Sequence, residues 1–293
     1  MSRAPFRGRL QEAVGKYGPL CVGIDPHPGL LKAWGLDVDV AGLERFTRQV
    51  VEAMAGHVAL LKPQVALFET FGSGGLAVLE RALADAREAG VLTIADAKRG
   101  DIGSTMAAYA HAWLAEDAPL RADAVTLSPY LGVGALAPAL DLAVATGRGV
   151  FVLARTSNPE AAGVQSAQAW VAGSGGSARG MREVAQSVVD ALADHNAAHG
   201  DGSAGAVVGL TRGTTGRDHG LDLSALGGPV LVPGLGAQGG TPADVADVFG
   251  AGGALGADGG PVVPVSAREV LTAGPSHGAL RAAVDALNGA LTG

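Results

Sequence analysis

Short β-branched runs alternate with alanine-rich segments along the chain, and about eight such units can be distinguished by their periodicity. The runs predict strands because they end in small or polar residues, whereas the alanine-rich segments have the spacing of amphipathic helices. The predicted strands cover residues 20–25, 58–62, 91–98, 124–128, 150–155, 206–211, 230–234 and 262–266. The predicted helices lie near residues 41–55, 75–89, 104–116, 133–145, 182–198, 241–249 and 278–291.

Hydrophobic strands that alternate with helices indicate a parallel sheet covered on its outer side. About eight repeats in a chain of 293 residues predict an α/β fold, a closed (β/α)8 TIM barrel, with residues 1–293 forming a single domain. A doubly wound open sheet is the alternative. It is disfavoured because the first strand-to-helix turn, at residues 25–28, lacks the glycines that bring a backbone close to a dinucleotide pyrophosphate.

Two connections depart from the repeating pattern. Residues 161–180 are rich in Gly, Ser and Ala, and we expect them to form a long irregular loop after the fifth strand. The connection near residues 222–225 is too short for more than a turn or two of helix.

Composition limits the class of protein. Hydrophobic residues make up 48% of the chain, which excludes a disordered protein and permits a large core. The net charge of −7 argues against nucleic acid or an anionic membrane as the main partner, and no run approaches the roughly 20 apolar residues of a membrane span. Cys21 lies in an apolar run, so we expect a buried thiol, no disulfide or cysteine metal site, and a cytoplasmic location.

Charged and polar residues are sparse within the predicted strands but occur at their C-terminal ends. In a barrel of this kind, the functional groups stand at that end. This placement predicts one site at the rim, formed by side chains from five consecutive strands. They are Asp25, Lys62, Asp96, Lys98, Ser128, Arg155 and Ser157.

Asp96 and Lys98 are two residues apart, so regular strand geometry would direct both side chains to the same side. Asp101 follows after Gly100. A lysine flanked by carboxylates is expected to stay protonated and to act as a fixed cation and proton donor. A salt-bridge cluster that only supports a helix start is the alternative; the convergence of Lys62 on the same rim favours a functional site.

A second group of residues suits a phosphate. Residues 232–244 form a glycine-rich turn that leads into a helix, which Thr241 can cap together with Asp244. The exposed amides of such a turn can bind phosphate. Ser266 and Glu269 suggest a second capped helix start, with Arg268 available to pair with the same anion. Both segments follow the seventh and eighth strands, where phosphate sites of these barrels often lie.

The run Asp96-Ala-Lys98-Arg99-Gly100-Asp101-Ile102 resembles the Asp-x-Lys-x-x-Asp-Ile element of orotidine 5′-phosphate decarboxylases. The longer bacterial branch of that family is the most similar, because Phe68-Glu69 and the Arg-Thr-Ser-Asn element match it. The resemblance covers most of the chain. It includes Val22-Gly-Ile-Asp25, Leu61-Lys62-Pro63-Gln64, Ser128-Pro-Tyr130, Arg155-Thr-Ser157-Asn158, Pro233-Gly-Leu-Gly-Ala-Gln238-Gly-Gly240 and Ser266-Ala-Arg268.

The resemblance implies a carbon–carbon lyase that converts orotidine 5′-phosphate into uridine 5′-phosphate and CO₂ in pyrimidine biosynthesis, without a cofactor or metal. It also implies a homodimer with its active sites at the interface. Lys62, Asp96 and Lys98 would come from one subunit, while Asp101 and Thr105 would reach into the site of the other. Lys98 would stabilise negative charge at C6 of the pyrimidine and then protonate that carbon.

The resemblance further implies the substrate contacts. Asp25 and Lys62 would hold the ribose, Ser157 the pyrimidine edge, and Gln238 and Arg268 the phosphate. The remaining substrate-binding positions would be Ser128, Gly236 and Gly239. The family usually has Asn-Ser-Ser-Arg where this chain has Val265-Ser266-Ala267-Arg268, which changes the surroundings of that arginine.

Two other functions are compatible with the pattern. A related class uses a similar Asp-x-Lys-x-x-Asp element with Mg²⁺ to decarboxylate or condense sugar phosphates, and Glu69 is a conceivable extra metal ligand here. A non-catalytic sensor of a phosphate ligand could also retain the barrel, but it would not need the alternating charges at positions 62, 96, 98 and 101.

Overall fold

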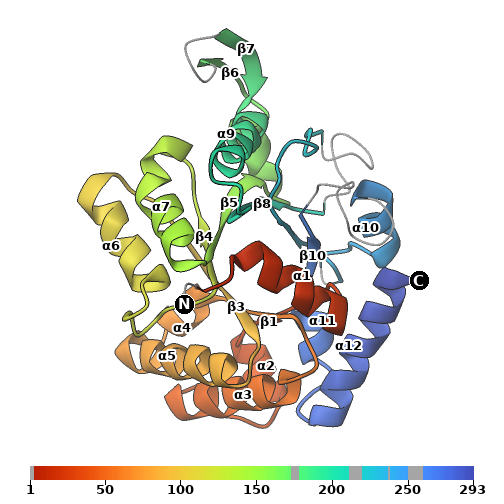
Figure 1. The fold of residues 1–293 in the computed structure, drawn as a ribbon. Coiled ribbons are helices and arrows are strands. Elements are labelled where there is room, and N and C mark those ends of the chain that lie inside the picture. The colour runs from red at the N-terminus through yellow and green to blue at the C-terminus, as the bar shows by residue number, and fades with distance from the viewer. Residues whose placement is uncertain (1–2, 173–177, 211–219, 237, 250–259) are drawn as a thin grey trace.

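The protein folds into a closed parallel β-barrel surrounded by helices (Figure 1). The computed structural model describes residues 3–172, 178–210, 220–236, 238–249 and 260–293. Within these residues the strands follow the order β1-β10-β9-β8-β5-β4-β3-β2, so the predicted TIM barrel is confirmed and the open sheet is wrong. The barrel strands are β1 (Cys21–Ile24), β2 (Leu60–Pro63), β3 (Leu92–Arg99), β4 (Ala124–Leu127), β5 (Gly149–Arg155), β8 (Ala204–Val208), β9 (Val230–Pro233) and β10 (Val262–Ser266).

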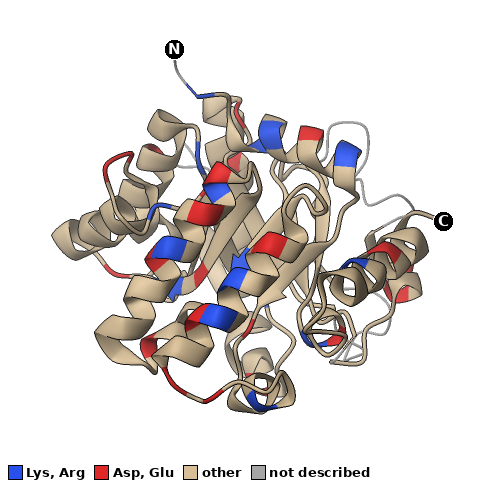
Figure 2. Cartoon of the chain, turned by 90° about the horizontal axis from the view of Figure 1, so that it is seen from below, with Lys and Arg blue, Asp and Glu red and all other residues tan. Residues whose placement is uncertain are grey.

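Each predicted helix overlaps a helix of the structure. In α3, residues Leu43, Phe46 and Val50 recur at helical spacing and are fully buried against the barrel, while the Asp39 carboxylate caps the helix by accepting from the Gly42 amide. Charged residues lie mostly on the surrounding helices and loops (Figure 2). The outer helices are α3 (Val40–Met54), α5 (Gly72–Glu88), α6 (Gly103–Leu114), α7 (Ala137–Thr146), α9 (Val184–His199), α10 (Pro242–Phe249) and α12 (His277–Thr292).

An N-terminal helix, α1 (Phe6–Tyr17), was not predicted from the sequence. It lies across the N-terminal end of the barrel (Figure 1), where Phe6 and Leu10 pack against barrel residues. The rings of Phe6 and Phe151 meet edge to face, with centroids 5.9 Å apart. Charged, polar and glycine residues interrupt the apolar positions of α1, and this hid a helix whose apolar contact is confined to one end of the barrel. With this end covered, the opposite end of the strands remains for a ligand.

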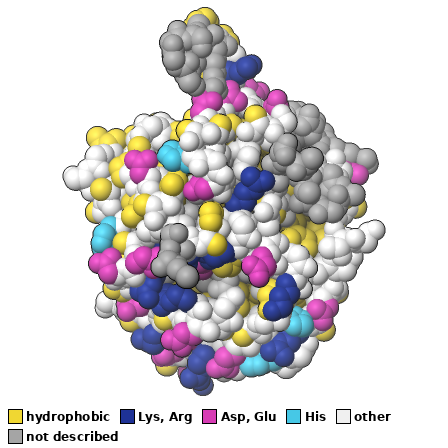
Figure 3. Space-filling view, viewed as in Figure 1, with side chains coloured by type: hydrophobic (Ala, Val, Ile, Leu, Met, Phe, Trp, Pro, Cys, Tyr) yellow, Lys and Arg dark blue, Asp and Glu magenta, His cyan; other side chains and the backbone are white. Residues whose placement is uncertain are grey.

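The expectation of an irregular loop over residues 161–180 was wrong for the part that is described. This part contains α8 (Ala162–Gln165), β6 (Gln168–Ala172) and the start of β7 (Ala178–Glu183), and the two strands form an antiparallel hairpin that projects from the barrel (Figures 1 and 3). The loop-like composition concealed this short pairing. The Arg155 guanidinium donates to Glu183 and Ser166 at the base of the hairpin. The prediction that Arg155 belongs to the site at the rim was therefore wrong.

The remaining features of the fold concern one short connection, the cysteine and the short helices. Residues 222–225 form no more than a turn, within the limit that was predicted. The end of the sixth predicted strand, Thr211, lies outside the described residues. Cys21 is buried as expected, and burial raises the pKa of its thiol to about 12. None of the described helices is long and apolar enough to cross a membrane. The remaining helices are α2 (Pro28–Ala33), α4 (Val65–Glu69), η1 (Val133–Leu136), η2 (Pro159–Ala161) and α11 (Arg268–Leu271).

Candidate active site

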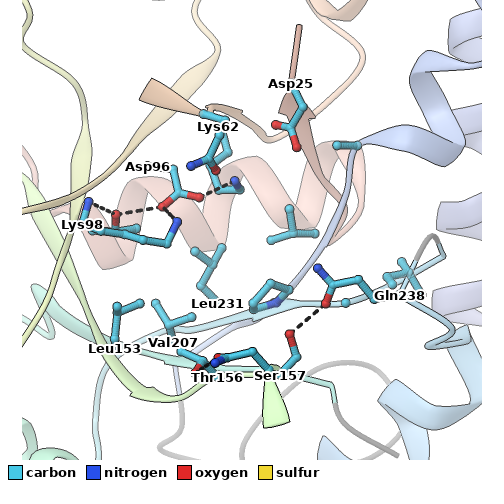
Figure 4. Close-up of a pocket in the computed structure, with 18 of the residues that line it drawn as sticks. Asp25, Lys62, Asp96, Lys98, Leu153, Thr156, Ser157, Val207, Leu231 and Gln238 are labelled. Atoms are coloured by element: carbon cyan, nitrogen blue, oxygen red, sulfur yellow. Dashed lines mark hydrogen bonds and ion pairs between the residues drawn. The ribbon is translucent and has the colours of Figure 1, made fainter. Parts of the chain in front are cut away.

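A cavity of about 580 Å³ lies at the C-terminal ends of the barrel strands (Figure 4). Both polar and apolar side chains line it, as is usual for a site that binds a small molecule. The residues proposed from the sequence that line it are Asp25, Lys62, Asp96, Lys98, Ser157, Gln238 and Arg268. Polar residues to which the sequence assigned no role also line it, among them His27, Gln64, Thr126, Thr156, Asn158 and Gln165.

Three charged side chains form a continuous chain on one wall of the cavity. The Lys62 ammonium lies 2.7 Å from Asp96 Oδ2, and the Lys98 ammonium lies 2.5 Å from Asp96 Oδ1 (Figure 4). Lys62 and Asp96 are buried, whereas 45% of the Lys98 side chain is exposed. Asp96 therefore holds Lys98 from one side and leaves the rest of its ammonium group accessible from the cavity.

The electrostatics of this cluster favour charged groups. Burial by itself lowers the pKa of Lys62, but the attraction of Asp96 and Asp25 outweighs burial, so the pKa lies above its ordinary value. Burial by itself raises the pKa of Asp96, but the attraction of Lys62 and Lys98 outweighs it, and the pKa lies well below its usual range. Asp96 is thus an anion between two lysines at neutral pH.

The backbone of β3 is irregular where these side chains emerge. Ala95 pairs with Val125 and Arg99 pairs with Leu127, so three residues of β3 oppose the single residue Thr126 of β4. Lys98 has a φ of 47°. Within the described part of the chain, it is the single non-glycine residue whose backbone adopts a left-handed conformation. Asp96 and Lys98 do meet, as predicted, but the regular two-residue repeat of a strand is the wrong reason for it.

Thr126 was missed in the sequence. Its hydroxyl donates to Asp96 Oδ1 and accepts from the Lys98 amide, each at 2.9 Å. A signal existed, because Thr126 stands two residues before Ser128 on a predicted strand and so shares its face.

The opposite wall carries the residues expected at the phosphate and the pyrimidine. The Ser157 hydroxyl donates to Gln238 Oε1 at 2.8 Å, which joins the end of β5 to the turn after β9. Gln238 and Arg268 line the same cavity, in which the side chains of Leu153, Val207 and Leu231 form an apolar part of the lining (Figure 4).

The glycine-rich turn itself is closed by internal hydrogen bonds. The Gly236 amide donates to the Gly240 carbonyl at 2.8 Å, and the Gly239 amide donates to the Gly236 carbonyl at 2.7 Å. Gly236 and Gly239 have φ values of 80° and 89°, which favour glycine, but neither lines the cavity. The structure therefore brings Gln238, and not these two glycines, to the cavity.

The two predicted helix caps have different outcomes. Thr241 and Asp244 form the reciprocal cap of α10, since the Thr241 amide donates to Asp244 Oδ2 at 2.8 Å and the Asp244 amide donates to the Thr241 hydroxyl at 3.2 Å. The predicted cap by Ser266 is wrong. Ser266 is a buried residue of β10 that pairs with Val22, and α11 begins only at Arg268 without a side-chain cap.

Three further predicted residues lie outside this cavity. Asp101 Oδ1 accepts from the adjacent Ile102 amide at 2.7 Å, and Thr105 is exposed on α6. Ser128 does not line the cavity either, and its amide donates to the Arg99 carbonyl at 2.8 Å. Within one chain, Asp96 therefore contacts Lys98, whereas Asp101 lies away from the cavity.

The alternative function, a Mg²⁺-dependent enzyme, would need side chains that can bind the metal. The described residues contain no group of three or more His, Cys, Asp or Glu side chains that could hold a metal ion. Glu69, the conceivable extra ligand, is paired with Arg99 and does not line the cavity.

Comparison with known proteins decides the family. Residues 18–283 match the model of the orotidine 5′-phosphate decarboxylase / HUMPS family. The chain belongs to this family. A Salinispora arenicola relative named orotidine 5′-phosphate decarboxylase is 57% identical over 96% of this chain and 94% of its own length. A Streptomyces coelicolor relative of the same name is 56% identical over 96% of this chain and 95% of its own.

Solved structures of the family share the fold. A crystal structure from Streptomyces avermitilis, assigned as an orotidine 5′-phosphate decarboxylase, has a TM-score of 0.87 and 53% identity and covers 99% of this chain and 96% of its own. The OMP decarboxylase of Leishmania donovani has a TM-score of 0.71 and 26% identity, with 98% and 99% covered. The resemblance drawn from the motifs is therefore confirmed at the level of the family.

Proposed function

We propose that this chain decarboxylates orotidine 5′-phosphate to uridine 5′-phosphate and CO₂, a step of pyrimidine biosynthesis, as a carbon–carbon lyase without a cofactor. The observation that carries the proposal is the Lys62–Asp96–Lys98 chain, with Lys62 and Asp96 buried, on the wall of a cavity in a member of this family. A phosphate-ligand sensor would not need this arrangement. The enzyme works in the cytoplasm, an inference supported by its one cysteine, Cys21, being buried.

Lys98 acts on the pyrimidine C6. When the bond from C6 to the carboxylate breaks, its electron pair stays on C6 and CO₂ leaves. The Lys98 ammonium stabilises this charge and then donates a proton to C6, and the neutral amine regains a proton from water. Asp96 keeps the ammonium in place, because one of its carboxylate oxygens contacts Lys98 while the other contacts Lys62.

Contacts far from C6 supply further stabilisation. Removal of one well-placed electrostatic partner costs about 3–4 kcal/mol, which is small beside the roughly 23 kcal/mol at the upper end of enzymatic accelerations. Gln238 and Arg268 bind the phosphate, and this binding energy orients the pyrimidine against Lys98. Asp25 and Lys62 hold the ribose, and Ser157 contacts the pyrimidine edge. Gly236 and Gly239 shape the turn that presents Gln238.

Replacing Arg268 with alanine is expected to lower kcat/KM for the nucleotide about 10- to 100-fold, because a charge-assisted pair with phosphate contributes about 1.5–3 kcal/mol. Turnover of the nucleoside orotidine, which lacks the phosphate, should stay within about threefold. Steady-state kinetics with both substrates test this. Arg48→Ala, an exposed arginine of α3 paired with Glu52, serves as the control. Equal losses with nucleotide and nucleoside would exclude Arg268 as the phosphate anchor.

The active enzyme is a homodimer with shared sites. Asp101 and Thr105 lie outside this chain's cavity. The segments that follow the neighbouring strands β3 and β4 also carry exposed apolar side chains, Ile102, Tyr130 and Leu131, which are 62%, 82% and 54% exposed. Apolar exposure of this kind marks protein interfaces. In a twofold dimer this rim would face the site of the partner, where Asp101 would reach Lys98 and Thr105 would reach the substrate.

Mixed dimers test the sharing of sites. Asp101→Ala and Lys98→Ala, each inactive alone, are unfolded together and refolded as a mixture. If Asp101 serves the partner's site, half of the dimers are mixed and one of their two sites is intact, so about a quarter of wild-type turnover should return. Lys62→Ala mixed with Lys98→Ala is the matched control and should stay inactive, because both residues serve the same subunit's site. No recovery in the first mixture, with mixed dimers shown by native mass spectrometry, would contradict shared sites.

A further inference from the structure

Thr126 links the two groups that fix the position of Lys98. Its hydroxyl accepts a hydrogen bond from the Lys98 backbone amide and donates its own hydrogen to Asp96 Oδ1, each at 2.9 Å. The same Asp96 oxygen contacts the Lys98 ammonium at 2.5 Å. Thr126 is 1% exposed, so its hydroxyl is shielded from bulk solvent. One buried hydroxyl therefore contacts both the main chain of Lys98 and the carboxylate that holds its side chain.

The backbone at Lys98 needs such a support. A left-handed conformation is unfavourable for lysine and persists only where the surroundings enforce it. The φ of 47° at Lys98 occurs where β3 loses its regular register with β4, between the pairs Ala95–Val125 and Arg99–Leu127. Thr126 is the β4 residue opposite this irregularity, and its side chain supplies an acceptor for the Lys98 amide.

We propose that Thr126 is a positioning residue of the decarboxylation, which acts through Lys98 by holding its backbone in the left-handed conformation and by orienting Asp96. This inference rests on the proposed function, because it concerns the placement of the proton donor. The Thr126 hydroxyl has one hydrogen, which it donates in a hydrogen bond to Asp96. Its oxygen lone pairs therefore remain to accept from the Lys98 amide. Loss of the hydroxyl releases both contacts at once.

The test compares Thr126→Val, which keeps the shape but removes the hydroxyl, with Thr126→Ser, which keeps the hydroxyl. A displacement of a reacting group by about 1 Å can cost 10²-fold, so kcat of Thr126→Val should fall about 10- to 100-fold. KM and the affinity for uridine 5′-phosphate should change less than about threefold, since the phosphate is bound on the opposite wall and Lys62 keeps its contact with Asp96 Oδ2. Thr126→Ser should restore kcat to within about threefold of the wild type.

Thr93 provides a matched control in the same barrel. It is also a buried threonine, 3% exposed, and its hydroxyl likewise accepts from a backbone amide, that of Asp123 at 3.2 Å, and donates to an aspartate, Asp123 Oδ2 at 3.4 Å. Thr93→Val removes the same pair of contacts away from the cavity. It should lower the melting temperature as Thr126→Val does, but leave kcat unchanged.

The outcomes separate this inference from the proposed function. Wild-type kcat in folded Thr126→Val, together with an inactive Lys98→Ala, would overturn the role of Thr126 and leave the decarboxylase mechanism standing. Near-normal turnover by Lys98→Ala would instead overturn the mechanism itself. A parallel fall of kcat in Thr93→Val, or no rescue by serine, would reduce Thr126 to a structural residue. If Thr126→Val does not fold, Thr126→Cys takes its place, because a thiol is only a weak donor and acceptor.

Discussion

Replacing Lys98 with alanine is expected to lower turnover of orotidine 5′-phosphate by at least about 10⁴-fold, since it removes both an electrostatic partner, worth about 10²–10³, and a proton donor, worth about 10²–10⁴. Binding of uridine 5′-phosphate should persist, because the phosphate and ribose contacts remain. The loss should appear in kcat when CO₂ release is followed, with nucleotide affinity measured separately by calorimetry.

The Lys98 variant should also fold normally. The side chain is 45% exposed, and Lys62 keeps its contact with Asp96 when Lys98 is shortened. Lys16→Ala, which alters a lysine on α1 at the far end of the barrel, is the control for removal of a lysine. Turnover near the wild-type value in folded Lys98→Ala would remove Lys98 from the chemistry.

Replacing Asp96 with asparagine is expected to have the second largest effect. The buried Lys62 loses the nearer of the two carboxylates that favour its charge, and breaking a buried pair costs about 3–5 kcal/mol of unfolding free energy. Turnover should fall by about 10² or more, because the Lys98 ammonium loses its anchor. Denaturant unfolding and steady-state kinetics measure the two effects.

Asp123→Asn is the matched control for that substitution. Asp123 is as buried as Asp96, at 6% against 7% exposed, and it pairs with Arg9 away from the cavity. Its replacement should destabilise the fold while kcat stays near the wild-type value. Equal losses of kcat in both variants would mean that Asp96 acts through stability alone.

The stability difference between wild type and Asp96→Asn depends on pH in a fixed direction. The folded-state pKa of Asp96 is lowered, so its contribution is fully present above the unfolded value of about 4 and is lost as pH falls toward the depressed pKa. The pKa of Lys62 is raised, so its contribution is fully present below about 10.4 and is lost only above that. The difference should be constant between about pH 5 and 9 and shrink below about pH 4.

The periodicity of the sequence predicted the barrel because each barrel strand is largely apolar and each outer helix buries one face. The polar strand ends predicted the position of the site at the rim, because Asp25, Lys62 and Asp96 interrupt otherwise apolar runs. Local patterns could not predict α1, whose few buried side chains depend on contacts with strands distant in the sequence, Phe151 among them.

The details of the site required tertiary information. The left-handed backbone of Lys98 follows from the pairing of β3 with β4, which no local motif encodes. Ser266 has the spacing of a helix cap, yet its register with Val22 keeps it within β10. The glycines at 236 and 239 suggest a phosphate-binding backbone, but their amides are used by the turn itself. In each case, hydrogen bonds to a neighbouring strand or within a turn determine the local conformation, which a short sequence pattern does not specify.

The most direct measurement concerns the carbon that Lys98 is proposed to protonate. Uridine 5′-phosphate is incubated with the enzyme in D₂O, and the replacement of hydrogen by deuterium at C6 is followed by NMR. If the Lys98 ammonium stabilises the C6 anion and exchanges its proton with it, the wild type will incorporate deuterium and Lys98→Ala, saturated with the same nucleotide, will not. Exchange by Lys98→Ala at the wild-type rate would contradict the account.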